Sequence, residues 1–317
     1  MDPWGPNATT FNVESTPALR TDGSICIGCA SDGRFFSILP NGTEEWIFIY
    51  GAGITSSPVV DRNGTAYFGS QDGYLYSILR NGSLNWKINI GVTIDHTSPA
   101  LDSEGRVYIC SNDGYLNTIL SNGSLYWKLF LGEDPSLNPA IMSDGSILVS
   151  ASQRSLFAVS KDGRTDWSFV TGQPLVNSPL RMAAPSIAAN GTIVLGGLDG
   201  QVYLLRPNGS MIWSRSIGGP VEYSPALSAD GLIFVGALDR LYCLDSNGNE
   251  KWNVQLPAKV FGPIIGPDGT IYLSVLNKGL YAIGAQESFI LFTSLIIGIV
   301  AVIVVFLLLL VISRRKK

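Results

Sequence analysis

Two of the four cysteines stand three residues apart in the stretch CIGC, Cys26 to Cys29, a spacing that redox and metal sites use. Such a motif normally opens a helix or pairs with a second CxxC. Here it is expected on a strand, where residues three apart point to opposite faces. Cys29 and Cys110 each stand three residues before the Asp of an Asp-Gly turn, as Gly69 does. We therefore interpret these cysteines as small buried side chains, with redox or metal chemistry as the alternative.

His96, the single histidine, follows Asp95 in the stretch GVTIDHTSP. The pair could supply a general base, but a lone histidine in a loop has no second histidine with which to share a metal. The turns DRNG, DSEG and PDGT offer oxygen ligands for calcium. None of them continues to the closing Glu of an EF-hand loop, and each runs at once into an expected strand. We expect no catalytic residue and no metal site.

The elements that must position these residues repeat with a period near 41. Six tryptophans are separated by 40, 41, 40, 46 and 39 residues, and a seventh lies 42 residues before them. A proline followed six residues later by a glycine also recurs seven times, from Pro17 and Gly23 to Pro263 and Gly269. The tryptophans are Trp4, Trp46, Trp86, Trp127, Trp167, Trp213 and Trp252.

Each unit reads as four short strands. In the second unit, residues 58–60, 65–70, 74–79 and 84–90 are rich in β-branched and aromatic types, and the turns DRNG, QDG and RNGS separate them. Asn-Gly and Asp-Gly pairs suit turns that need a positive φ. Four antiparallel strands in about 40 residues form a propeller blade, so the sequence predicts an all-β fold with seven blades.

The two ends of the repeat predict how the propeller closes. The chain begins within a unit, with Trp4 where a fourth strand should be, and the seventh unit stops after its third strand at 279–284. We expect the segment around Trp4 to complete that blade, so that residues 1–285 close by pairing of the N- and C-terminal segments and no sheet edge stays open. The longer spacing between Trp167 and Trp213 is predicted to be a loop insertion.

The C-terminal part differs in kind from the repeats. Residues 289–312 contain 24 residues without a charge, which as a helix would measure about 36 Å and cross a hydrocarbon core of about 30 Å. We expect a transmembrane helix there, after a short linker at 286–288 and before a basic tail at 313–317. Without the four residues of RRKK, 17 Lys and Arg face 25 Asp and Glu, a net charge of −8. Such an acidic domain argues against a nucleic acid partner.

The unit SPxxDxNGTxYxGSxDGxLYxLxxNGxxxW resembles the repeat of the PQQ-like, quinoprotein-dehydrogenase-type propellers, and the resemblance covers residues 4 to about 284. It implies that each tryptophan docks neighbouring blades beside a small residue. The family includes quinoprotein dehydrogenases and propellers that serve as scaffolds, among them a subunit of an envelope assembly complex. The dehydrogenases resemble this chain less, because they have eight blades and an adjacent Cys-Cys pair against the quinone. Cys26, Cys29, Cys110 and Cys243 include no adjacent pair, so we expect no PQQ and no other cofactor.

A ligand is expected on the face formed by the connections between blades and the turns between second and third strands, because loops on a rigid scaffold concentrate binding. The insertion that carries Arg181 and Met182 lies on this face. The candidate residues are Glu14, Asp95, His96, Glu133, Asp134, Arg181, Glu222, Tyr223 and Lys259. Seven N-x-[S/T] sequons fit a glycosylated exterior, but all except Asn7 lie in the repeat's own Asn-Gly turns.

The basic tail places the C-terminus in the cytoplasm and the propeller outside by the positive-inside rule. The N-terminal residues lack a signal peptide, so either a leader precedes them or the protein is tail-anchored with a cytosolic propeller. The sequence predicts a monomeric, non-enzymatic, single-pass membrane propeller that binds a protein or carbohydrate. A membrane-bound PQQ-dependent dehydrogenase and a scaffold of an envelope assembly complex are the alternatives.

Overall fold

The computed structural model describes residues 13–49, 51–132, 138–151, 155–172 and 184–284, and the backbone of 289–291. The chain divides into two compact units, each described by itself. The first comprises residues 1–185 with 206–210, and the second comprises residues 186–205 with 211–317.

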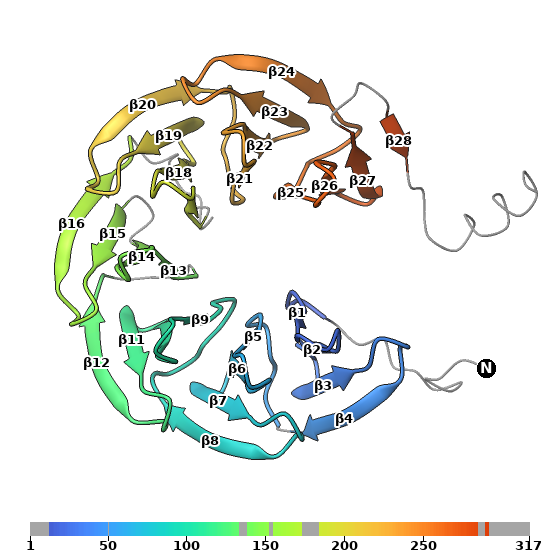
Figure 1. Ribbon diagram of the computed structural model, residues 1–317, viewed down its shortest axis with the longest axis vertical. Coiled ribbons are helices and arrows are strands. Elements are labelled where there is room, and N and C mark those ends of the chain that lie inside the picture. Colours follow the sequence, from blue (N-terminus) through green and yellow to red (C-terminus); the bar gives the residue numbers. More distant parts are fainter. Residues whose placement is uncertain are drawn as a thin grey trace, which may run out of the picture. The chain divides into compact units, whose positions relative to one another are not determined.

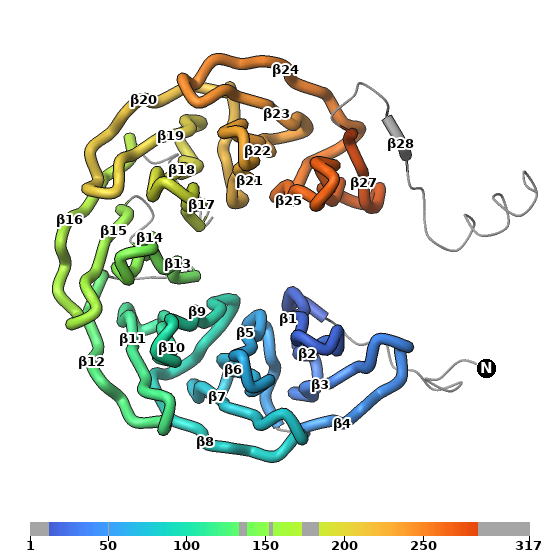
Figure 2. The backbone as a smooth tube through the Cα atoms, in the orientation of Figure 1, coloured from blue at the N-terminus to red at the C-terminus, as the bar shows by residue number. Residues whose placement is uncertain are grey.

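The described residues form seven four-stranded antiparallel sheets and no helix, and each sheet is a meander in chain order (Figures 1 and 2). The sheets of the first unit contain β1 (Ala18–Leu19), β2 (Ile25–Gly28), β3 (Arg34–Ile38), β4 (Glu44–Ile49); β5 (Val59–Val60), β6 (Ala66–Gly69), β7 (Tyr74–Ile78), β8 (Leu84–Asn89); β9 (Ala100–Leu101), β10 (Val107–Ser111), β11 (Tyr115–Ile119), β12 (Leu125–Phe130); and β13 (Ala140–Ile141), β14 (Ile147–Ala151), β15 (Ser155–Val159), β16 (Thr165–Val170).

The second unit holds three further sheets. They contain β17 (Ser186–Ile187), β18 (Ile193–Gly196), β19 (Gln201–Leu205), β20 (Met211–Ser216); β21 (Ala226–Leu227), β22 (Ile233–Ala237), β23 (Arg240–Leu244), β24 (Glu250–Gln255); and β25 (Ile264–Ile265), β26 (Ile271–Val275), β27 (Gly279–Ile283), β28 (Phe289–Leu291). Seven such sheets are consistent with the predicted seven blades. Among the described residues no helix could cross a membrane.

Turn chemistry and apolar patterning together explain the strands. In the second sheet, the Asp61 carboxylate accepts hydrogen bonds from the backbone N–H groups of Asn63 and Thr65, which fixes the turn between β5 and β6. Gly64 completes that turn with a φ of 82°, a conformation that a side chain would strain. The strand β6 is buried along its whole length, whereas β8 alternates exposed and half-buried residues. The inner strands therefore form the core, and the fourth strand is the outer edge of its sheet.

The core lies between successive sheets within each unit. One cluster joins the first sheet to the second through Cys26, Phe35, Phe68 and Tyr76, and the Phe35 and Phe68 rings stack with centroids 4.2 Å apart. In the second unit, a cluster that includes Val235 and Val202 joins the fifth sheet to the sixth. Within each unit, successive sheets thus bury apolar faces against one another, as adjacent propeller blades do.

A tryptophan in the fourth strand of one sheet covers a glycine in the next. The Trp86 Nε1–H donates to the Ser121 carbonyl at 2.9 Å, and a Cβ on Gly123 would stand 2.7 Å from the Trp86 ring. We call this the indole–glycine contact. It recurs with these pairs: Trp46 on Gly82, Trp127 on Gly163, Trp167 on Gly209 and Trp213 on Gly248. Each of these indoles also donates to the carbonyl two residues before the glycine, at 2.8 to 3.0 Å.

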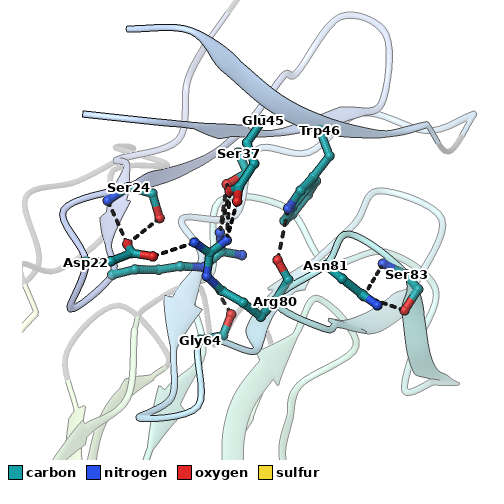
Figure 3. A network of polar contacts seen from close by, with 10 residues as sticks. Asp22, Ser24, Ser37, Glu45, Trp46, Gly64, Arg80, Asn81 and Ser83 are labelled. Atoms are coloured by element: carbon teal, nitrogen blue, oxygen red, sulfur yellow. Dashed lines mark hydrogen bonds and ion pairs between the residues drawn. The ribbon is translucent and has the colours of Figure 1, made fainter. Parts of the chain in front are cut away.

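Between the first and second sheets, an ionic network supplements the indole–glycine contact. Arg80, just before the turn that Trp46 covers, pairs with the carboxylates of Asp22 and Glu45 (Figure 3). Arg20 is buried beside them, and its Nε donates to the Gly64 carbonyl at 3.0 Å. Its Nη1 donates to the Ser37 hydroxyl at 2.7 Å.

A hydrogen-bonded ladder joins the residues that precede the repeated prolines. The Thr16 N–H donates to the Ser57 hydroxyl at 2.8 Å, the Ser57 N–H to the Ser98 hydroxyl at 3.0 Å, and the Ser98 N–H to the Asn138 side-chain oxygen at 2.7 Å. Each step spans about 41 residues, so the ladder repeats with the sheets. It ties together the segments that lead into the inner strands and stiffens the loops beside them.

Three predictions need correction. The fourth strand of the last sheet is β28 and not the segment around Trp4, since Ile283 pairs with Phe289 and Tyr281 with Leu291. Phe289–Leu291 therefore do not begin a helix. The free edge of β27 leaves backbone N–H and C=O groups unpaired, and this short apolar segment satisfies them.

The third correction concerns Cys29. Its distance from the Asp-Gly turn predicts that Cys29 takes the position of Gly69. The strand register shows instead that Gly28 is the equivalent of Gly69. The N–H of each glycine bonds to the hydroxyl of a serine 13 residues earlier. Cys110 does take the position of Gly69. The turn after β2 is one residue longer, which displaces Cys29 to the first position beyond the strand.

Candidate functional site

The structure brings three of the predicted face residues together in the first unit. The His96 Nε2 lies 3.6 Å from the Asp95 Oδ1 and 3.9 Å from the Glu14 Oε2. Glu14 precedes the first sheet, and Asp95 and His96 lie in the connection from β8 to β9. The site thus combines two carboxylates and an imidazole from loops of different sheets.

Side chains that the sequence did not single out hold this cluster in place. The Asp95 Oδ1 accepts from the Thr55 hydroxyl at 2.7 Å and from the Gln71 Nε2 at 3.2 Å. The Asp95 N–H donates to the Asn112 Oδ1 at 3.2 Å. Gln71 and Asn112 share one repeat position, directly before an Asp-Gly turn, so the repeat could have pointed to them. Loops of the first three sheets are therefore bonded to one another around Asp95.

The backbone of His96 is in an unusual conformation. Its φ is 55°, in the left-handed region that costs a residue with a Cβ about 1–2 kcal/mol. The His96 N–H donates to the Thr55 hydroxyl at 3.1 Å, which holds the strained turn. The imidazole is 44% exposed as a result. Strained residues of this kind are frequent at binding sites, and here the strain presents a side chain beside two carboxylates.

The second unit contains the other described members of the predicted face. The Lys259 Nζ donates to the Glu222 Oε2 at 2.5 Å and lies 5.9 Å from the centre of the Tyr223 ring. The Tyr223 and Phe261 rings are 5.0 Å apart. Burial raises the pKa of the Tyr223 hydroxyl, while the Lys259 cation acts in the opposite direction. The predicted residues Glu133, Asp134 and Arg181, and the predicted docking residue Trp4, lie outside the described residues.

The four cysteines are free and buried. Burial raises the pKa of the Cys26 thiol to about 11, that of Cys110 to about 12 and that of Cys243 to about 11. Thiolates are therefore disfavoured at Cys26, Cys110 and Cys243. The Cys29 sulfur lies 3.3 Å from the Ser31 hydroxyl. These separate thiols do not fit the adjacent pair that packs against a quinone. The described residues also hold no group of three His, Cys, Asp or Glu placed to bind a metal ion.

Comparison with known proteins agrees with this architecture. The model of the family described as outer membrane protein assembly factor BamB matches residues 71–225 and 199–288, more than half of the chain. The outer membrane protein assembly factor BamB of Burkholderia pseudomallei (strain K96243) is 24% identical over 160 residues. That match covers 48% of this chain and 40% of the relative, so the chain spans less than half of that relative's length.

Solved structures share the fold at low sequence identity. BamB from Moraxella catarrhalis is 16% identical with a TM-score of 0.66, over 84% of this chain and 83% of that one. Sqt1 from Saccharomyces cerevisiae is 12% identical with a TM-score of 0.75, over 89% and 84%. A streptogramin B lyase is 11% identical with a TM-score of 0.61, over 84% and 92%. At these identities the likeness concerns the fold alone.

The repeated four-stranded sheets, with the family match, define a PQQ-like repeat β-propeller. The resemblance seen in the repeat unit is thereby confirmed. The chain belongs to the family described as outer membrane protein assembly factor BamB.

Proposed function

We propose that this propeller is a non-enzymatic scaffold, attached to a membrane by residues 292–312, that holds a protein partner on the loops of its first unit. The observation that carries the proposal is the bonded cluster around Asp95. Loops from three sheets are fixed by side-chain hydrogen bonds and present His96 between the carboxylates of Asp95 and Glu14. A rigid, mostly acidic surface of this kind suits a partner with a basic segment.

Membership of a family described as an assembly factor supports a scaffold more than an enzyme. The buried, separate thiols support a chain that uses no PQQ. The acidic propeller and the uncharged stretch at 292–312 support attachment to the outer side of a membrane, with the RRKK tail in the cytoplasm. A role in an envelope assembly complex would be one form of the same function.

The proposal is tested by recovering partners of the tagged full chain from its own membranes after mild cross-linking. Glu14→Gln with Asp95→Asn removes two charges and keeps the oxygen that Thr55 and Gln71 bond. We expect about tenfold weaker recovery of the partner, a change of about 1.4 kcal/mol in binding free energy.

Glu44→Gln is the control, because Glu44 is an exposed carboxylate on the outer strand β4, away from the connecting loops. Recovery should stay unchanged in this variant. Equal recovery with both variants would contradict the proposed face. Dye reduction by the purified chain supplied with PQQ and calcium would contradict the non-enzymatic role.

A further inference from the structure

Three segments of the second unit form one continuous surface. They are Leu238–Arg240 at the turn from β22 into the first residue of β23, the connection through Lys259, and Leu276–Lys278 between β26 and β27. The Val260 N–H donates to the Leu238 carbonyl at 2.8 Å, and the Leu276 N–H donates to the Lys259 carbonyl at 2.8 Å. Backbone bonds therefore fix both turns against the segment between them. We call these residues the leucine–lysine surface.

Each of these two turns carries an exposed leucine where the matching turns of the first unit carry a polar residue. Leu238 is 53% exposed and Leu276 is 43% exposed. The residues that stand at the position of Leu238 in the first three sheets are Ser31, Gln71 and Asn112, and each precedes an aspartate as Leu238 precedes Asp239. Turn tips favour small polar residues, so two exposed leucines at this position call for a partner that accepts apolar side chains.

The backbone conformation at these tips also supports a contact surface. Leu238 has a φ of 52° and Asn277 has a φ of 55°. Together with His96 they are the positive-φ residues other than glycine among the described parts of the chain. Asparagine tolerates this region, but leucine is strained there. Leu238 is thus held in a costly conformation that leaves most of its side chain in solvent.

The charges of the surface are mainly basic. Lys278 is exposed, and Arg240 donates to the neutral side chains of Asn253 and Gln255 rather than to a carboxylate. Lys259 is paired with Glu222, and Asp239 accepts from the Gln255 amide. Three cations therefore face two carboxylates. The surface thus carries a net charge of +1, and exposed leucines beside a net positive charge suit the interface of a bilayer with anionic lipids.

The position of β28 indicates which membrane the leucine–lysine surface would contact. Because Phe289 pairs with Ile283 and Leu291 with Tyr281, β28 runs toward the end of β27 that follows the Leu276–Lys278 turn. The chain then enters the uncharged sequence of residues 292–312. We infer that the leucine–lysine surface rests on the lipid bilayer to which this sequence attaches the propeller. The inference builds on the membrane attachment in the proposed function.

The test uses the full chain reconstituted into liposomes of phosphatidylcholine and phosphatidylglycerol. Leu238→Cys and Leu276→Cys each provide one accessible thiol for a fluorescent label, because the four native cysteines are buried. Ser31→Cys and Asn112→Cys provide matched controls at the turn tips of the first unit. Lipids with a nitroxide near the headgroup serve as the quencher, and flotation in a density gradient reports attachment.

We expect the chain to float and the labels at 238 and 276 to lose fluorescence, while those at 31 and 112 keep theirs. A chain that floats without quenching at 238 and 276 would overturn the contact and leave the attachment intact. Equal quenching of all four labels would overturn the assignment to this surface. A chain that does not float would overturn both the contact and the attachment.

Discussion

Two neighbouring junctions of the first unit differ in a single respect. Between the second and third sheets, Trp86 covers Gly123 and donates to the Ser121 carbonyl. Between the first and second sheets, Trp46 makes the same contact with Gly82, and Arg80 adds ion pairs to Asp22 and Glu45. Both junctions share the indole–glycine contact and a buried apolar cluster, and the ions of the first junction are an addition to these.

The added ions are better explained as specifying which sheets pack together than as stabilising the fold. Exposed ion pairs contribute little, and burying a cation costs free energy. Arg20 is 3% exposed, and its guanidinium carbon lies 5.2 Å from the centre of the Trp46 ring. Its Nη2 has no hydrogen-bond partner among the residues that the structure describes. A buried guanidinium with an unpaired N–H donor makes the pairing of the first two sheets specific and lowers the stability of the fold.

The largest effect expected from breaking a junction is that of Trp86→Ala. It removes an indole, its hydrogen bond and the cover of Gly123, so the free energy of unfolding should fall by about 3 kcal/mol. Trp252→Ala should cost clearly less, because Trp252 is 37% exposed. Urea unfolding followed by circular dichroism compares the two variants. Equal losses would show that the indole–glycine contact is not what joins the sheets.

A smaller effect distinguishes the indole–glycine contact from the backbone strain of the turn that contains the glycine. Gly123 has a φ of 87° and a Cβ would stand 2.7 Å from the Trp86 ring, whereas Gly42 has a φ of 82° and nothing within 4 Å. Gly42→Ala should cost about 1 kcal/mol of backbone strain. Gly123→Ala should cost about 1–3 kcal/mol more, because the indole must move. Differential scanning calorimetry measures both, and similar melting temperatures would contradict the close approach.

The smallest effect concerns the ions of the first junction. The Ser24 hydroxyl and N–H, followed by Arg80, lower the pKa of Asp22 from its ordinary 3.8 to about 2. A carboxyl whose pKa is lower in the folded state stabilises it above the ordinary pKa, and this contribution is lost as the pH falls from about 4 toward about 2. Ser24→Ala should raise the pKa of Asp22 most and Arg80→Gln should raise it less.

Carboxyl carbon NMR titration measures these pKa values. Asp144 is the internal control, because Ser146 lowers its pKa in the same way without help from Arg80. Arg80→Gln should leave the pKa of Asp144 unchanged. If it also leaves that of Asp22 unchanged, the pairing drawn in Figure 3 does not persist in solution.

Most of the fold followed from the repeat, because turn residues and apolar runs act locally. The expected strands of the second repeat, such as 74–79 and 84–90, agree with β7 and β8 to within one residue at each end. The indole–glycine contact was expected beside a small residue of an adjacent strand. The structure places that glycine in the turn before the fourth strand instead.

Features that depart from the repeat could not be predicted from it. Arg20 occupies the position of Asp61 and Asp102, and its surroundings depend on residues up to 44 positions away. Likewise, the cluster around Asp95 depends on Thr55 and Gln71, which lie 40 and 24 residues before it and have ordinary types for loops. The prediction that a helix begins at Phe289 was wrong because Phe289–Leu291 suit both a helix in lipid and an edge strand. Local sequence alone does not decide between them.

The indole–glycine contact also bears on how such a chain changes over generations. Each central sheet supplies a tryptophan to one neighbour and a glycine to the other, so duplicating or deleting one unit of about 41 residues would leave a compatible pair at the new boundary. The first two sheets are the exception, since Asp22 and Glu45 need Arg80 specifically. Recombination between units should therefore be tolerated in the interior of the array and selected against at its beginning.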